Sequence, residues 1–175
     1  MVKKLLLIFV TPLILLSSEL QLVEGSIKAH TEVFGEPNIN PMTNKINTNL
    51  SINDGIESIT GDITINAMSL VSDSSDRDAN MYETLGAMDF STINFKVLNI
   101  SKSQDGYTIG GVLNLHGVSK GVEAKGVISN IKNNMIDLNS KFTIKMTDYG
   151  IEPPTMLFLT VRDEVDIDVN LKLQR

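Results

Sequence analysis

Residues 110–125, GGVLNLHGVSKGVEAK, decide the fold because they contain two alternating apolar runs joined by a turn. In the first run Ile109, Leu113 and Leu115 fall on one face, which is the period-two pattern of a β-strand. The following residues 116–121 (HGVSKG) include two glycines, which adopt positive φ without a steric clash. The segment therefore predicts a β-hairpin with its turn between residues 116 and 121.

Similar alternation before and after this hairpin predicts an all-β fold. The further runs are residues 20–34, 45–52, 56–70, 91–100, 125–131, 135–146 and 161–173. Between the first two, residues 35–44 (GEPNINPMTN) are rich in Pro and Asn and predict a long turn. About eight strands with short polar connections are typical of a closed, lipocalin-like antiparallel barrel, and a Greek-key sandwich fits the strand count almost as well.

One short helix is expected between residues 72 and 90, where the period-two pattern stops. Ser75 or Asp76 could cap its first turn, and Gly86 is expected to end it. Apolar residues then recur at helical spacing, giving one amphipathic face. This face consists of Ala79, Met81, Tyr82, Leu85 and Met88.

The composition excludes several classes of protein. At 175 residues and with a mean hydropathy of +0.05, the chain can form one globular domain and is not a multi-span membrane protein. Its net charge of -6 argues against a nucleic-acid partner, because such partners are bound mainly through Lys and Arg. The absence of Cys rules out disulfides and Cys-ligated metal centres.

The N-terminal segment has the order of a secretory signal peptide. Two lysines precede the apolar run LLLIFVTPLILL, and two serines follow it. The run is shorter than the roughly 20 residues needed to span a bilayer, and Pro12 interrupts it. We therefore expect residues 1–18 to be cleaved, leaving a periplasmic domain of residues 19–175.

The sequence contains few groups that could catalyse a reaction or bind a metal ion. His30 and His116 are the only histidines, and neither has the spacing of a zinc motif. Asp73, Asp76 and Asp78 do not have the spacing of a calcium loop and are better explained as helix-capping carboxylates. We expect no enzymatic activity, no metal and no cofactor.

Four stretches of the chain together form a recognisable pattern: SDRDANMYETLGAMDFSTINFKV (75–97), LNLHGVSKGVEA (113–124), KFTIKMTDYGIEPP (141–154) and VRDEVDIDVNLKL (161–173). In this order they resemble the YceI-like family of polyisoprenoid-binding, periplasmic proteins. The family usually opens with a Tyr and an Asp-x-x-His-Ser segment, where this chain has EGSIKAHTEVFGE. The resemblance implies a barrel that encloses a long isoprenoid or other lipid chain, and hence a lipid carrier.

The residues expected to contact such a ligand come from the more apolar face of each strand and from the helix. Seven would line a tunnel along the barrel axis, and Met81, Leu85 and Met88 would line or cover its mouth. The seven are Ile65, Phe95, Val97, Leu113, Leu115, Phe142 and Ile144.

Two further features of the inward faces bear on the space inside the barrel. The small residues Gly111, Ala124 and Gly126 would leave room for a ligand, and Phe158 would add an inward aromatic ring. Periodicity alone leaves open a barrel filled by its own side chains, which would act as a stress or interaction protein through its acidic surface. The expected partner is the lipid. We also expect transient contact with a membrane or with a membrane protein that supplies the lipid, and the chain could form a homodimer.

Overall fold

The computed structural model describes residues 17–33, 36–129, 134–156 and 158–175. The expected signal peptide lies almost entirely outside these residues. Within them, no helix is long and apolar enough to cross a bilayer.

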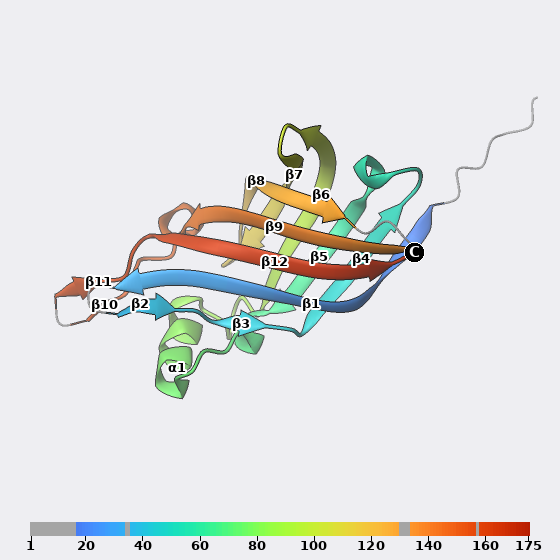
Figure 1. The fold of residues 1–175 in the computed structure, drawn as a ribbon. Helices are drawn as coiled ribbons and strands as arrows, with labels where there is room; N and C mark the ends of the chain where they lie inside the picture. Colours follow the sequence, from blue (N-terminus) through green and yellow to red (C-terminus); the bar gives the residue numbers. More distant parts are fainter. Residues whose placement is uncertain (1–16, 34–35, 130–133, 157) are drawn as a thin grey trace, which may run out of the picture.

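Eight of the described strands close into one antiparallel barrel (Figure 1). Each strand pairs with the next, and the pairing of the last strand with the first completes the circle. This confirms the predicted closed barrel with one short α-helix. In barrel order the strands are β1 (Ser18–Val33), β4 (Ile46–Ile52), β5 (Thr60–Asn66), β6 (Thr92–Ser103), β7 (Gly106–Leu115), β8 (Val118–Ser129), β9 (Met135–Lys145) and β12 (Glu164–Gln174).

Several short elements connect or flank the barrel strands. The described part of the chain has three 3₁₀ turns: η1 (Ile56–Ser58), η2 (Ala67–Ser69) and η3 (Met146–Tyr149). The strands β10 (Thr155–Met156) and β11 (Leu159–Thr160) form a separate hairpin. The strands β2 (Glu36–Ile39) and β3 (Met42–Thr43) both pair with β1, so the expectation of one long turn over residues 35–44 was wrong. The long strand β1 has backbone N–H and C=O groups that need partners. Hydrogen bonding to these groups favours strands in β2 and β3 despite their turn-like composition.

The hairpin formed by β7 and β8 turns more tightly than predicted. Leu115 pairs directly with Val118, so only His116 and Gly117 lie between the strands. Their φ values of 52° and 73° are both left-handed, as a type I′ turn requires. Gly121 is not part of the turn and pairs with Val112 inside the ladder.

Two β-bulges set which side chains face inward. In β1 the register shifts between Leu22 and Glu24, so the inward face changes from even to odd positions. Leu20, before the bulge, and Ile27, after it, therefore both pack in the core, whereas Val23 is exposed. A second register shift lies in β6, between Val97 and Asn99. Because of it, both Val97 and Ile100 face the core.

The helix α1 (Ser75–Thr84) lies outside one end of the barrel, below the strands in Figure 1. Its N-cap is Ser74, one residue before the predicted caps, and the Ser74 hydroxyl accepts a hydrogen bond from the Arg77 amide. Gly86, with φ of 56°, follows the C-cap Leu85 and turns the chain away, as predicted.

The barrel is packed solid at the end remote from α1. Side chains from the starts of β1 and β5 and the ends of β4, β6, β8 and β12 meet there, and several are completely buried. The most buried are Leu20, Leu50, Ile59 and Leu173, each with no more than 1% of its surface exposed. We call this set of side chains the closed end.

Candidate ligand-binding cavity

The other half of the barrel is hollow. A cavity of about 790 Å³ extends from the middle of the barrel to α1 and to the segments beside the β10–β11 hairpin. Its wall is made mainly of Ile, Val, Leu and Phe side chains. This volume falls within the range of roughly 300–1,000 Å³ that is usual for small-molecule sites.

Nine of the ten residues predicted to contact a ligand line this cavity. They are Ile65, Met81, Leu85, Phe95, Val97, Leu113, Leu115, Phe142 and Ile144. Their contact with a ligand stays a prediction. The tenth, Met88, lies outside the cavity wall with 86% of its surface exposed. The turn at Gly86 directs Ala87 inward and Met88 outward, so the helical spacing does not extend to residue 88.

Two of the three small inward residues do not leave space for a ligand. A Cβ atom on Gly111 would lie 2.5 Å from the Phe95 ring, and one on Gly126 would lie 3.0 Å from Ile109. Neighbouring side chains therefore already occupy these two positions. Ala124 lines the cavity and is the one of the three that borders open volume.

Two aromatic rings stand on the cavity wall. Phe95 of β6 and Phe142 of β9 stack with their centroids 6.0 Å apart and their planes at 24°. Since β6 and β9 are separated by two strands in the sheet, this contact crosses the barrel interior. It narrows the cavity without closing it.

The cavity has one apolar end and one mouth. The closed end blocks the barrel axis, so the expected tunnel is a blind cavity with a single mouth. Most of the polar lining residues lie on or just before α1: Ser72, Arg77, Asp78, Asn80, Glu83 and Thr84. A ligand that fits this distribution has an apolar tail and a polar head near α1.

Polar contacts hold α1 against the mouth. Asp78 is only 8% exposed, and its carboxylate accepts a 2.8 Å hydrogen bond from the Ser72 amide. The Tyr82 hydroxyl donates a 2.6 Å bond to the Leu70 carbonyl. Burial, together with the charge of Asp78, raises the pKa of the Tyr82 hydroxyl, which therefore stays protonated near neutral pH.

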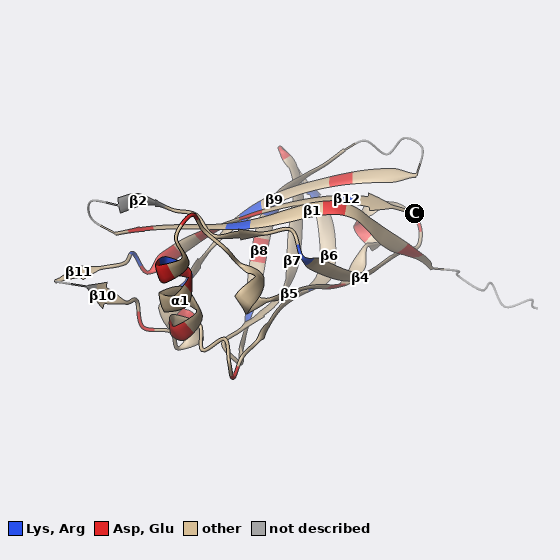
Figure 2. Ribbon diagram, turned by 90° about the horizontal axis from the view of Figure 1, so that it is seen from below, with Lys and Arg blue, Asp and Glu red and all other residues tan. Residues whose placement is uncertain are grey.

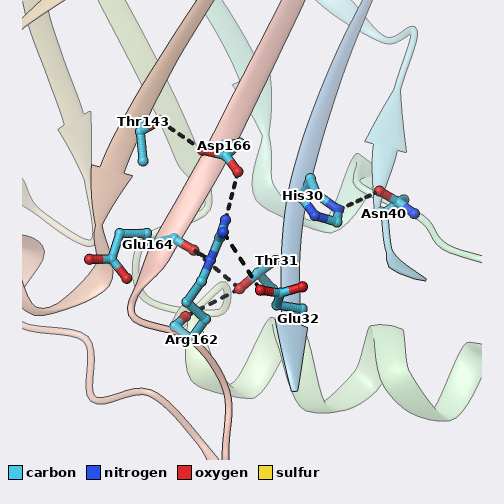
Figure 3. A network of polar contacts seen from close by, with 8 residues as sticks. All are labelled: His30, Thr31, Glu32, Asn40, Thr143, Arg162, Glu164 and Asp166. Carbon is cyan, nitrogen blue, oxygen red and sulfur yellow. Dashed lines mark hydrogen bonds and ion pairs between the residues drawn. The ribbon is translucent and has the colours of Figure 1, made fainter. Parts of the chain in front are cut away.

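A polar network closes the seam between β1 and β12 beside the mouth (Figure 3). The Arg162 guanidinium donates a 2.6 Å bond to the Asp166 carboxylate, which also accepts from the Thr143 hydroxyl. Both hydrogen bonds lower the pKa of the Asp166 carboxyl, and the bond from Arg162 has the larger effect. The Thr31 hydroxyl contacts the carbonyls of Arg162 and Glu164, and the Arg162 amide donates to the Glu32 carbonyl.

The two histidines take structural positions. His116 Nδ1 lies 3.1 Å from the Tyr149 carbonyl oxygen, within hydrogen-bonding distance of the backbone. His30 instead pairs with a side chain, since its Nδ1 lies 2.8 Å from Asn40 Oδ1. No group of three or more His, Cys, Asp or Glu side chains in the described part of the chain could hold a metal ion.

Phe158 is the residue that sequence reasoning placed most wrongly. It was expected to face inward, but it lies at the tip of the β10–β11 hairpin with 98% of its surface exposed. The sequence contained a signal for this position. In TMLFLT (155–160) four apolar residues are consecutive, which is not the alternation of a half-buried strand.

A closed eight-stranded antiparallel barrel with a blind apolar cavity defines the class of lipocalin-like barrels. The sequence model of the YceI-like domain matches residues 21–173, so the chain belongs to the YceI-like family. No curated protein matches the sequence.

Solved structures have the same fold. BcnA of Burkholderia cenocepacia superposes with a TM-score of 0.74 at 14% identity, over 85% of this chain and 95% of that one. A YceI protein of Campylobacter jejuni gives 0.65 at 16% identity, over 75% and 81% of the two chains. A polyisoprenoid binding domain of Saccharophagus degradans, implicated in plant cell wall breakdown, gives 0.62 at 12% identity, over 89% and 97%.

Proposed function

We propose that this protein is a periplasmic carrier for a long-chain amphiphilic lipid, such as a polyisoprenoid, an isoprenoid quinone or a fatty-acid derivative. The observation that carries the proposal is the blind cavity of about 790 Å³ with an almost wholly apolar wall. Family membership supports the proposal, as does the similarity to a polyisoprenoid binding domain.

An amphiphilic lipid matches the distribution of polar groups in the cavity. Transfer of an apolar tail from water into the cavity gains roughly 0.8 kcal/mol per CH₂ group. The deep part of the cavity offers the tail apolar side chains such as Val97, Ile109 and Leu138. The head would lie beside α1, where hydroxyl, amide and charged groups can replace water as hydrogen-bond partners.

Binding without catalysis is the activity that these residues support best. The polar groups at the mouth already serve the fold, since Asp78 and Tyr82 make hydrogen bonds that position α1. The alternative of a filled barrel acting through its acidic surface assumes that side chains occupy the interior, and the cavity of about 790 Å³ favours the carrier over it. The periplasmic location rests on the signal-like residues 1–18.

Native mass spectrometry of the protein purified from its own host tests this proposal. We expect a population heavier than the apoprotein by the mass of one lipid, which organic extraction releases and tandem mass spectrometry identifies. The same sample denatured before spraying serves as the control, because a non-covalent ligand is then lost. Protein that carries no lipid and takes up no parinaric acid, a fluorescent 18-carbon fatty acid, would exclude a carrier function.

A further inference from the structure

The β10–β11 hairpin extends beyond the barrel at the mouth of the cavity (Figure 1). At its tip Phe158 is 98% exposed, although Phe is among the residues that proteins most often bury. Its φ of 72° is left-handed, a conformation that is rare for a bulky side chain and is associated with functional sites. The fold thus holds a large apolar side chain out in solvent.

The hairpin is also part of the cavity mouth. Pro154, Leu159 and Val161 line the cavity, and the Val161 amide donates a 3.0 Å hydrogen bond to the Pro154 carbonyl across the hairpin base. The side-chain hydroxyls of Thr155 and Thr160 lie 2.9 Å apart and join the two strands. Leu159, which is 40% exposed and follows Phe158 directly, therefore links the exposed tip to the cavity wall.

The charges around this end are mostly acidic, as Figure 2 shows on α1. Exposed carboxylates include Asp73, Asp76, Glu83 and Glu152. The two arginines at this end are in ion pairs: Arg77 with Asp73, and Arg162 with Asp166 and Glu32. A partner at this end should be apolar and carry little negative charge.

The size of the exposed tip favours a lipid surface over a protein. A stable protein interface buries roughly 800 Å² on each partner, whereas one Phe side chain contributes about 150–250 Å². A bilayer has no such requirement, because single aromatic and aliphatic side chains can enter its interfacial region.

We infer that the β10–β11 hairpin inserts Phe158 into a zwitterionic lipid surface and thereby places the cavity mouth against the membrane. The inference rests on the proposed function, since docking of the mouth serves a carrier. A lipid tail could then pass between bilayer and cavity along Leu159 and Val161 without crossing water. The acidic side chains around the mouth would disfavour an anionic bilayer.

Because the chain contains no Trp, Phe158→Trp provides a fluorophore at the tip alone. We expect its emission to shift to the blue on addition of phosphatidylcholine vesicles and to be quenched by brominated acyl chains. The matched control is Val127→Trp, on the outer face of β8 towards the closed end, where the native side chain is 54% exposed. Equal responses of the two variants, or no response of either, would overturn the inference.

A second variant separates docking from ligand binding. Phe158→Asp should lower partition onto phosphatidylcholine vesicles by roughly ten- to a hundred-fold. The reason is that the variant loses the free energy gained when the Phe158 side chain moves from water into the bilayer. It should bind parinaric acid in the absence of vesicles as the wild type does. Unchanged vesicle partition would refute docking, whereas wild-type protein that carries no lipid and takes up no parinaric acid would refute the carrier proposal itself.

Two further measurements identify the surface that the hairpin contacts. Partition onto phosphatidylglycerol vesicles should be weaker than onto phosphatidylcholine at about 0.01 M salt, and the difference should shrink at about 0.15 M as the Debye length falls from roughly 30 to 8 Å. In sedimentation experiments we expect the wild type and Phe158→Asp to have the same state of association. If the wild type self-associates and Phe158→Asp does not, the hairpin contacts a second copy of the chain, and the lipid-surface inference is wrong.

Discussion

Enlarging Ala124 tests directly whether the mouth half of the barrel is hollow. Ala124 lies on the inward face of β8, opposite Ile109, and lines the cavity. In Ala124→Phe the new ring would project into the open volume of about 790 Å³. It would obstruct the deep part of the cavity and leave the outer surface of the barrel unchanged.

The sign of the stability change depends on whether that volume exists. Burying a Phe side chain gains about 1.5–3 kcal/mol, and fixing its rotamer opposes this by about 1 kcal/mol. For a hollow barrel we therefore expect the free energy of unfolding of the apoprotein to be unchanged or raised by up to about 2 kcal/mol. In a filled core the same substitution would overpack the site and lower the free energy by about 1–3 kcal/mol.

Urea unfolding followed by far-ultraviolet circular dichroism measures this difference, and parinaric acid titration measures binding. We expect Ala124→Phe to unfold at the same or a higher urea concentration and to bind at least tenfold more weakly. Gly111→Ala is the control for a filled position, because its Cβ would lie 2.4 Å from the Lys96 carbonyl oxygen, and it should be destabilised. A destabilised Ala124→Phe, or one that binds parinaric acid normally, would refute the reasoning.

Four further predictions concern the closed end, the seam, the turn and the N-terminus. Leu173→Ala should lower the free energy of unfolding by about 2–5 kcal/mol, since Leu173 is fully buried, and a loss below about 1 kcal/mol in urea unfolding would contradict the solid packing there. The pKa of the Asp166 carboxyl is lower in the folded protein than its value of about 3.9 in the unfolded chain. The ionised carboxylate therefore stabilises the fold above about pH 3.9, and this stabilisation is lost as the pH falls through the folded-state pKa. Asp166→Asn should weaken the acid dependence of Tm below about pH 4, and an unchanged profile would argue against the seam network. Gly117→Ala should lower stability by at least about 1 kcal/mol in the same urea assay, because φ is 73° and the new Cβ would lie 2.7 Å from the Phe90 ring; a neutral result would be inconsistent with the type I′ turn. Edman sequencing of periplasmic protein should place the mature N-terminus before the buried Leu20, and retention of Met1 would disprove export through a cleaved signal.

Much of the wall of the cavity could be predicted from the sequence because period-two alternation fixes the two faces of a strand. In TINFKV (92–97) the alternative register would have put Lys96 inside, and an unpaired buried charge is strongly unfavourable. Phe95 and Val97 are accordingly expected on the inward face, where the structure has them. The same reasoning holds for Leu113, Leu115, Phe142 and Ile144.

The depth of the cavity could not be predicted, because alternation gives the face of a residue but not the height at which it lies in the barrel. Leu113 and Leu173 are both inward Leu residues, yet one lines the cavity and the other fills the closed end. Their positions depend on the strand register and on the bulge at Leu22, which the sequence does not mark. Phe158 was misplaced because its segment was treated as part of the barrel, whereas β10 and β11 pair only with each other.

The most direct test of the central claim is an experimental structure of the protein purified from its own host with its lipid retained. We predict continuous density for an apolar tail inside the barrel, between Phe95, Phe142 and Ala124, with the polar head beside α1. Density that ends at the closed-end residues Leu20 and Leu173 would agree with a blind cavity. A barrel whose interior is filled by its own side chains, with lipid absent or bound only on the outer surface, would contradict the account.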